Sequence, residues 1–539
     1  MTADESMTET ETAERVLTAA DFFESKVPDP EEIPPLAPGA MADSKPYVAA
    51  PEFQEALGFP GELVEDWHDK AIDKLGELVG KYQALRVYLD SCVKCGACTD
   101  KCHYFLGTGD PNNMPVARQD LLRKVYRRHF TWSGKYLPWL VGAEDLTEQV
   151  LDEWYSYFHQ CSQCRRCSVY CPYGIDTAEI SMAAREIMDT VGKGQKYSNE
   201  IIGKVQTLGN NLGMQKKALE ATLEDLEEEI EDDTGVPVRI PVDEKGADIL
   251  LVTPSADFFA EPHVDGLIGY AKVFHQAGVS WTISSYASEA ANFGVFIGSY
   301  ENMREVALRI RKAAEDLGVK RLVFGECGHA WRVAYSFLNT LAGPFDFLDQ
   351  NYPIPQHICE FTHDLIERGE LKFDKSANDH IRLTFHDSCN VARASRMGDR
   401  PGGQFEIPRE IIKACCNHFY EMSPDTTREN TFCCGGGGGL LTDDLLELRE
   451  KGAQPRMRAL QQVAEDHGVT HMAAICAICK SQFSKVMPDY GFEMDAIVSV
   501  HQLVSNAIIL DGAESGESEE ADPGASGEAT DQSGEKGEE

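Results

Sequence analysis

The stretch Thr431-Phe-Cys433-Cys434-Gly435-Gly-Gly-Gly-Gly439 joins two adjacent cysteines to a run of five glycines. Such a run favours neither helix nor strand, because glycine loses the most backbone entropy on ordering and has no side chain to pack. A chain uses glycine where its backbone passes close to a bulky object or adopts a positive φ. The adjacent thiols indicate that this object is an iron-sulfur cluster.

Two further cysteine segments flank this stretch. Cys389 precedes it, and Cys476-Ala-Ile-Cys479 follows it. Together with Cys433 and Cys434 they supply five thiols, one more than a single zinc ion or one cubane cluster needs. We therefore predict that the five cysteines hold one larger, irregular iron-sulfur cluster and form the catalytic site. The alternatives are a glycine-rich surface loop with buried free thiols, or a zinc site.

A cysteine spacing of two, two and three intervening residues occurs twice in the first third of the chain, at Cys92, Cys95, Cys98 and Cys102 and again at Cys161, Cys164, Cys167 and Cys171. In two-cluster ferredoxins, three such thiolates hold one cubane and the fourth reaches the other cluster. We therefore predict two 4Fe-4S cubanes. Their ligand sets are Cys92, Cys95, Cys98 and Cys171, and Cys161, Cys164, Cys167 and Cys102. Zinc knuckles, the alternative, would use two C-x-x-C pairs.

Composition limits the classes of function. The formal net charge of -39 argues against nucleic-acid binding, because a phosphate backbone would be repelled. No Gly-x-Gly-x-x-Gly fingerprint follows a predicted strand, so neither a flavin nor a nicotinamide is expected in this chain. The 17 cysteines lie mostly in short-spaced clusters, which favours metal binding in a reducing cytoplasm. We expect no secretory signal and no membrane-spanning segment.

From residue 248 onward, short apolar runs alternate with helical patterns, as in buried parallel sheets. Strands are expected at 249–252, 322–324, 381–385 and 472–475. The region reads as two degenerate repeats, since residues 317–329 overlay on 467–479. This overlay places Glu326 on Cys476 and His329 on Cys479, and it places Ile283 and Ser284 on Cys433 and Cys434. It predicts a cluster in the second half only.

For several other reactive side chains, the sequence allows more than one role. Cys327 and Cys359, with His329 and His357, form either a small metal site, a redox-active thiol or simply buried structure. Cys415 and Cys416 are possible thiols near the active site. Arg393, Arg396 and Lys480 are either anion-binding residues or ordinary surface cations. The basic and aromatic stretch 115–139 is either a solvated helix face or a docking surface for a membrane subunit or anionic headgroups.

The cysteine pattern resembles that of known redox proteins. Residues 389–479 resemble the CCG domain of heterodisulfide reductases, and residues 90–505 resemble the HdrD subunits of those enzymes. Residues 102–120, CHYFLGTGDPNNMPVARQD, and 157–172, YFHQCSQCRRCSVYCP, are similar to the DsrK subunits of Dsr membrane complexes.

The resemblance implies two cubane 4Fe-4S clusters and one noncubane 4Fe-4S cluster. It implies a subunit on the inner, cytoplasmic face of the membrane, with a cytochrome b-type subunit and other Dsr subunits as partners. Its substrate would be a DsrC-like small protein, whose disulfide or trisulfide is reduced or formed at the S-S bond. The alternatives are an HdrD subunit of heterodisulfide reductase, or the iron-sulfur electron-transfer subunit of a lactate, glycolate or glycerol-3-phosphate oxidoreductase. An electron wire with zinc at the CCG site is the non-enzymatic alternative.

The expected fold is an α-helical, ferredoxin-type two-cluster domain followed by α/β CCG domains. The predicted boundaries are 1–60 for an acidic, Pro-rich arm, 61–233 for the two-cluster domain, 248–375 for the degenerate CCG half, 376–510 for the CCG half with the cluster, and 511–539 for a disordered acidic tail. Both ends combine acids with few apolar residues, which is typical of segments that cannot form a core.

Overall fold

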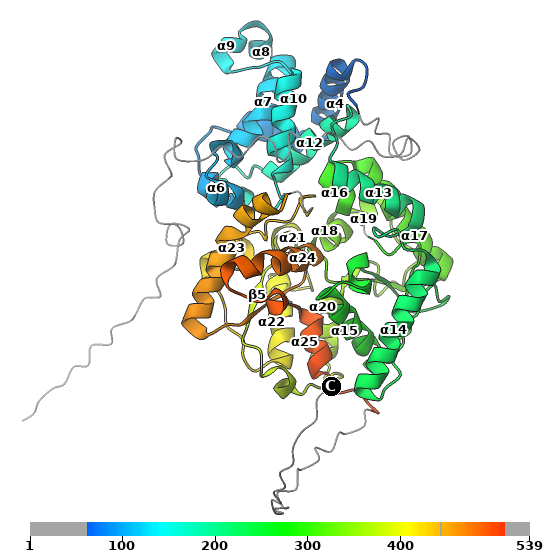
Figure 1. Cartoon of the computed structure of the whole chain (residues 1–539). Helices are drawn as coiled ribbons and strands as arrows, with labels where there is room; N and C mark the ends of the chain where they lie inside the picture. The colour runs from blue at the N-terminus through cyan, green and yellow to red at the C-terminus, as the bar shows by residue number, and fades with distance from the viewer. Residues whose placement is uncertain (1–61, 290–291, 442–444, 513–539) are drawn as a thin grey trace, which may run out of the picture.

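The computed structural model describes residues 62–289, 292–441 and 445–512. The predicted arm at 1–60, and all but the first two residues of the predicted tail, lie outside these ranges. Figure 1 shows the N-terminal helices as an upper group, coloured blue to cyan, above a larger body that contains the later elements.

The upper group is helical, as predicted for the region around the two cysteine motifs. Its helices are α4 (Trp67–Lys81), α5 (Gln83–Ser91), α6 (His103–Thr108), α7 (Pro115–Phe130), α8 (Trp132–Tyr136), α9 (Pro138–Val141), α10 (Glu148–His159), α11 (Arg166–Val169) and α12 (Thr177–Thr190). Three of them begin at residues suited to helix starts: Pro115 is the first residue of α7, Thr147 caps α10 and Asp176 caps α12. The motif cysteines lie in the turns between these helices, except Cys167, which lies in α11.

Two further helices lead from the upper group into the body: α13 (Lys196–Leu208) and α14 (Lys216–Thr234). In α14, Leu219, Leu223, Leu226 and Ile230 are buried. Their spacing of four, three and four residues keeps them on one helical face, while the acidic residues between them face solvent. α14 is therefore amphipathic, with its acidic residues on the side away from the core.

The first sheet of the body has four parallel strands in the order β2-β1-β3-β4. The strands are β1 (Ile249–Val252), β2 (Trp281–Ile283), β3 (Arg321–Phe324) and β4 (Gln356–His357). The accompanying helices are α15 (His263–Gln276), α16 (Asn292–Ile297), α17 (Tyr300–Leu317), α18 (Gly328–Ser336), α19 (Leu338–Ala342) and α20 (Ile358–Glu367). The strands predicted at 249–252 and 322–324 are confirmed, the latter beginning one residue earlier.

The second sheet has three parallel strands in the order β5-β6-β7. The strands are β5 (Leu383–His386), β6 (His471–Ala474) and β7 (Ile497–Ser499), and the helices are α21 (Cys389–Ala394), α22 (Gly403–Cys415), α23 (Leu446–His467), α24 (Ala477–Val486) and α25 (Val500–Ala507). The two predicted strands are present, with bounds shifted by one or two residues. The sequence pattern did not reveal β2, β4 and β7, because two or three residues carry too little periodicity.

One hydrophobic core joins both sheets, and it includes Leu250 of β1, Phe324 of β3, Phe385 of β5 and Val498 of β7. Helices cross from one half to the other: α15 packs on α25, and α22 packs on α20. The two sheets therefore form a single packed body, with the ends of their strands fixed relative to one another.

The predicted overlay of the halves holds in one place and fails in another. β3 and β6 begin 150 residues apart, the offset that the overlay uses. The overlay of Ile283 and Ser284 on Cys433 and Cys434 does not follow the sheets. Ile283 lies in β2, which pairs in parallel with β1 in the first sheet. In the second sheet, the residue that makes the corresponding parallel bridge to β5 is Phe419. Cys433 and Cys434 follow Phe419 by more than ten residues, so they do not occupy the position that Ile283 has in the first sheet.

Candidate metal centres

The five predicted catalytic thiols lie together. Cys433 interacts with Cys389 and Cys434, Cys434 interacts with Cys479, and Cys479 interacts with Cys476. All five belong to one buried cluster of side chains and are at most 3% exposed. All 17 cysteines of the chain lie within the described residues and are free. The structure therefore brings the five predicted cysteines together in one buried row of free thiols.

The parallel strands explain why these cysteines meet. β5 and β6 are neighbours, so their carboxyl ends lie at the same edge of the sheet. Cys389 begins α21 just after β5. Cys476 is the N-cap of α24 just after β6, and Cys479 lies in the first turn of that helix. The loop that holds Cys433 and Cys434 closes over this edge.

The glycine run fits against protein backbone, which corrects the expectation that its bulky neighbour is only the cofactor. A Cβ atom at Gly438 would lie 2.8 Å from the carbonyl oxygen of Cys161, and one at Gly435 would lie 2.6 Å from that of Arg449. Gly435, Gly438 and Gly439 also have positive φ. A side chain at Gly438 would therefore push the CCG loop away from the second cysteine motif, and one at Gly435 would push it away from α23.

The eight cysteines of the two motifs form two groups, and the last cysteine of each motif lies with the other motif. Cys92, Cys95, Cys98 and Cys171 line one small cavity. Burial, with smaller contributions from Cys171 and Cys92, raises the pKa of Cys98 to about 11. The side chain of Cys95 is exposed, so this outer group lies at the molecular surface.

The inner group contains Cys102 with the cysteines of the second motif. Cys167 interacts electrostatically with Cys102, Cys161 and Cys164. The buried guanidinium of Arg118 faces this group: burial would lower its pKa, but the charges of Cys161 and Cys102 raise it. The geometry thus brings together the two sets of four that the sequence predicted.

The inner group touches the CCG thiols directly. Cys164 interacts with Cys433, and it also interacts electrostatically with Cys389. Cys164 shares a buried cluster with the five CCG cysteines. The inner group and the CCG thiols therefore meet in one buried region, while the outer group lies at the molecular surface.

Two buried polar residues, His103 and Arg185, hold this junction together. The sequence assigned them no such role. His103 stands where the second motif has Pro172, and its two ring nitrogens lie 2.7 Å from Ser162 Oγ and 2.8 Å from the Gly452 carbonyl. Arg185 donates to the carbonyls of Cys161 and Gly438, at 2.7 and 2.9 Å. Several of these contacts join segments over 200 residues apart, so local sequence patterns carry no signal for them.

The end of β3 carries a buried ionic network where the end of β6 carries cysteines. Glu326 Oε1 lies 2.7 Å from His501 Nδ1, and Glu326 Oε2 lies 3.6 Å from Lys480 Nζ. Burial would raise the pKa of Glu326, but Lys480, His501 and Ser499 lower it to about 2. Glu326 is therefore an anion that links the first sheet to β7 and α24 of the second half.

The remaining candidates have mainly structural contacts. Cys415 and Cys416 lie in the core shared by the two sheets, apart from the cluster of CCG thiols, which corrects their suggested place near the active site. Arg393 donates to the carbonyls of Cys164, Glu429 and Thr431 and so positions the CCG loop. Lys480 is fully buried beside Glu326, so neither cation is an ordinary surface residue.

The two first-half thiols have different surroundings. Cys327 interacts with Cys476, next to the row of CCG thiols. The Cys359 sulfur lies within 4.8 Å of ligand atoms of Glu326 and His501. His329 Nδ1 lies 3.7 Å from Cys476 Sγ. The residues suggested as one small metal site are thus divided between the CCG thiols and the ionic network.

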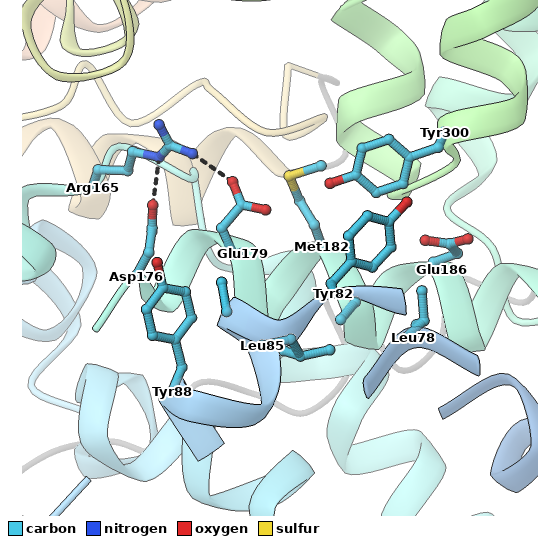
Figure 2. Close-up of a pocket in the computed structure, with 12 residues that line it drawn as sticks. Leu78, Tyr82, Leu85, Tyr88, Arg165, Asp176, Glu179, Met182, Glu186 and Tyr300 are labelled. Carbon is cyan, nitrogen blue, oxygen red and sulfur yellow. Dashed lines mark hydrogen bonds and ion pairs between the residues drawn. The ribbon is translucent and has the colours of Figure 1, made fainter. Parts of the chain in front are cut away.

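A separate cavity of about 250 Å³ lies between the upper helices and α17, and Figure 2 shows its lining. The rings of Tyr82 and Tyr300 stack with centroids 5.2 Å apart, and Arg165 pairs with Asp176 and Glu179. None of the residues that line this cavity is a cysteine. It is therefore distinct from the three thiol groups.

Comparisons with known proteins agree with the cysteine geometry. Residues 88–175 match the family model of the 4Fe-4S dicluster domain, and residues 383–484 match that of the cysteine-rich CCG domain. No solved structure matches the chain. Within the described residues, no helix is long and apolar enough to cross a bilayer.

Curated relatives cover most of the chain. The Hdr-like menaquinol oxidoreductase iron-sulfur subunit of Archaeoglobus profundus is 40% identical over 83% of this chain and 84% of its own length. A second protein of the same type, from Archaeoglobus fulgidus, is 39% identical over 83% and 85%. The HdrD protein of the dihydromethanophenazine:CoB-CoM heterodisulfide reductase of Methanosarcina mazei is 24% identical over 78% and 95%. The chain therefore belongs to the family of Hdr-like iron-sulfur subunits of oxidoreductases, related to HdrD of heterodisulfide reductase, and it carries 4Fe-4S clusters.

Proposed function

We propose that this chain is the catalytic iron-sulfur subunit of a membrane-associated complex, in which it exchanges electrons between a quinone pool and a protein disulfide or trisulfide. The observation that carries the proposal is the contact of Cys164 with Cys433, since it joins the thiols of a CCG site to those of an electron relay. A site that only stored metal would not need this contact with a second thiol group.

We assign the cofactors as follows. Cys92, Cys95, Cys98 and Cys171 hold an outer cubane, and Cys102, Cys161, Cys164 and Cys167 hold an inner cubane. Cys389, Cys433, Cys434, Cys476 and Cys479 hold a noncubane 4Fe-4S cluster. The donor set fits such clusters, because all thirteen residues are free thiols gathered into three groups and five exceed the ligand number of a cubane.

Reduction of an S-S bond consumes two electrons and two protons and releases two thiols. Cubanes pass electrons one at a time, and a cluster with several irons gives the sulfurs of the substrate a place to bind while both electrons arrive. The protein residues hold the thiols in place: Arg393 and Arg185 fix the backbone on either side of the CCG loop. Run in reverse, the same chemistry forms an S-S bond and delivers electrons to the relay.

The relatives suggest the partners. Two of them are named as subunits of menaquinol oxidoreductases, which supports a membrane partner of the cytochrome b type. We propose the DsrK-like role in particular, on the inner face of the cytoplasmic membrane, with a DsrC-like small protein as the sulfur substrate. Electrons then enter or leave the chain at the exposed Cys95 side of the outer group.

We also propose that the two sheets are degenerate copies of one unit. Cys327 caps α18 just after β3, and Cys476 caps α24 just after β6. His357 of the first half and Ser499 of the second half each form a capping box at the helix that follows the last strand. In this proposal the first half has lost its cluster ligands and supports the second.

The test is electron paramagnetic resonance of the anaerobically purified, oxidised chain. Addition of a thiol is expected to produce a new paramagnetic signal, because sulfur from the thiol binds at the CCG site. The signal should be lost in Cys433→Ala and Cys476→Ala and retained in Cys416→Ala, which removes a buried thiol outside the site. A signal that persists in the first two variants would contradict the proposal. Copurification with a flavoprotein would favour the hydroxy-acid oxidoreductase alternative.

A further inference from the structure

Two short helices, α8 and α9, form a projection that is separate from all three thiol groups. They occupy residues 132–141 and follow directly after the long helix α7. We call residues 131–142 the α8–α9 tip. Figure 1 shows the tip at the far end of the upper group, beyond the ends of α7 and α10 and away from the body.

The tip exposes large apolar side chains. Trp132, Tyr136, Trp139 and Leu140 are 71, 66, 77 and 71% exposed, and no other large hydrophobic side chain in the described ranges is as exposed. Isolated exposed apolar residues are common on proteins, but four within nine residues of a projection mark an interaction surface. Their exposure calls for a partner that covers them.

The conformation of the tip does not depend on these four side chains. Gly134 packs so closely on α7 that a Cβ atom there would lie 1.8 Å from the Arg127 carbonyl oxygen. Thr131 caps α8 by accepting from the Gly134 amide, and Arg127 Nη1 donates to the Val141 carbonyl at 3.1 Å. Because backbone contacts hold the tip, the aromatic rings are free to serve binding.

The charge of the tip differs from that of the whole protein. Residues 121–143 contain no Asp or Glu, although the chain has 89 acids and 50 Lys and Arg residues. Lys124 and Arg128 pair with Glu144 and Asp145 at its base. Lys135, on the tip itself, has no carboxylate within ion-pair distance among the described residues. At physiological ionic strength the acidic body is screened beyond about 8 Å, so the local charge decides what the tip attracts.

This combination suits a lipid surface better than a protein surface. Trp and Tyr prefer the headgroup region of a bilayer, and Lys and Arg beside them attract anionic lipids. A stable protein interface buries about 800 Å² and 20 to 30 residues on each side, whereas the tip has twelve residues. We propose that the α8–α9 tip inserts into the headgroup region of a bilayer that contains anionic lipids, independently of the sulfur chemistry.

Membrane binding of the tip would also fix the distance between the outer cysteines and the lipid surface. Gln119 Nε2 donates to Cys92 Sγ at 3.1 Å, and Arg123 donates to the Cys92 carbonyl at 2.8 Å. Both residues lie on α7, which continues to Phe130 and the tip. The eleven residue-to-residue steps from Gln119 to Phe130 rise about 17 Å at 1.5 Å per step. A membrane-bound tip would therefore hold the outer thiol group at roughly this depth behind the lipid surface.

Vesicle flotation of the full chain, purified anaerobically, tests the proposal. The vesicles contain phosphatidylcholine alone or an equal mixture with phosphatidylglycerol. We expect the chain to float with the mixed vesicles and less with the neutral ones. Bromine atoms on the acyl chains near the headgroups should quench the tryptophan fluorescence, because Trp132 and Trp139 are the most exposed of the six tryptophans.

Two matched variants keep all six tryptophans. Leu140→Asp should lower partition into the mixed vesicles by about tenfold or more, since it places a charge at the apolar contact. Ile354→Asp changes a side chain that is 57% exposed elsewhere and should bind like the original chain. Iron content and the unfolding midpoint confirm that both variants are folded.

Three results would overturn the proposal: no flotation with mixed vesicles, flotation without quenching, or equal flotation of Leu140→Asp and the original chain. Retention only on membranes that contain other protein subunits would also overturn it, and would assign the tip to a protein partner.

Discussion

Strand β3 of the first sheet and strand β6 of the second sheet are followed by residues of different chemistry. After β6, Cys476 and Cys479 join a buried row of thiols, whereas after β3, Glu326 joins a buried network with Lys480 and His501. Both arrangements use the same structural property, which is that side chains at the ends of neighbouring parallel strands meet at one edge. A strand end can thus serve cofactor binding or the joining of two halves, depending on its residues.

The largest expected effect comes from the thiol side of this comparison. Cys433→Ala removes the thiol that contacts Cys389, Cys434 and Cys164. With about twelve irons expected for three clusters, the iron content should fall by about one third and S-S bond turnover should be lost. Iron and sulfide analysis measures this, with Cys416→Ala as the control that retains both. Unchanged iron in Cys433→Ala would separate this thiol from the cofactor.

The next effect tests the exchange of cysteines between the two motifs. Cys171→Ser should alter the same resonance signal as Cys95→Ser, because both residues line the outer cavity. Cys102→Ser should alter a second signal, the one that Cys161→Ser also changes. Spectra of the four reduced variants measure this. If Cys171→Ser instead altered the same signal as Cys161→Ser, each motif would keep its own fourth ligand.

On the ionic side of the comparison, the expected effect is on stability. Glu326→Ala leaves Lys480 and His501 buried without their anion, and such a loss costs about 3 to 5 kcal/mol. Anaerobic urea unfolding measures the loss, and iron content should remain at the original level in the folded variant. A loss of iron equal to that of Cys433→Ala would mean that both strand ends serve the cluster.

The same carboxylate predicts a smaller, pH-dependent effect. The pKa of Glu326 is lowered to about 2 in the folded protein, and its ordinary value is near 4.5. A lowered pKa stabilises the fold above the unfolded value, and this contribution is lost as pH falls from about 4.5 towards 2. The difference in unfolding free energy between the original chain and Glu326→Gln should therefore be constant from pH 7 to about 5 and shrink below that. A difference that grows on acidification would contradict an ionised Glu326.

The cysteine groups could be predicted because their spacing is local. Three thiols in one tight turn must share a cluster, and the fourth ligand follows from the known two-cluster pattern. The strands β1, β3, β5 and β6 were also predictable, since nearly all of their four consecutive positions are buried and leave an apolar run. The overlay of the two halves correctly paired the starts of β3 and β6.

Contacts between distant segments could not be predicted. The roles of His103 and Arg185 depend on carbonyl groups more than 200 residues away. Arg393 and Lys480 resemble surface cations in sequence, and only the packing of the halves buries Lys480. The glycine run was correctly associated with a close approach, but its contact with the backbone of Cys161 required the three-dimensional fold.

The central claim is that the CCG thiols share one multi-iron cofactor. The most direct test is anomalous scattering at the iron absorption edge from crystals of the anaerobically purified chain. We predict one continuous iron peak within bonding distance of the sulfurs of Cys389, Cys433, Cys434, Cys476 and Cys479, separate from two cubane peaks. A signal at the zinc edge alone in this position, or electron density for a disulfide among these cysteines, would contradict this claim.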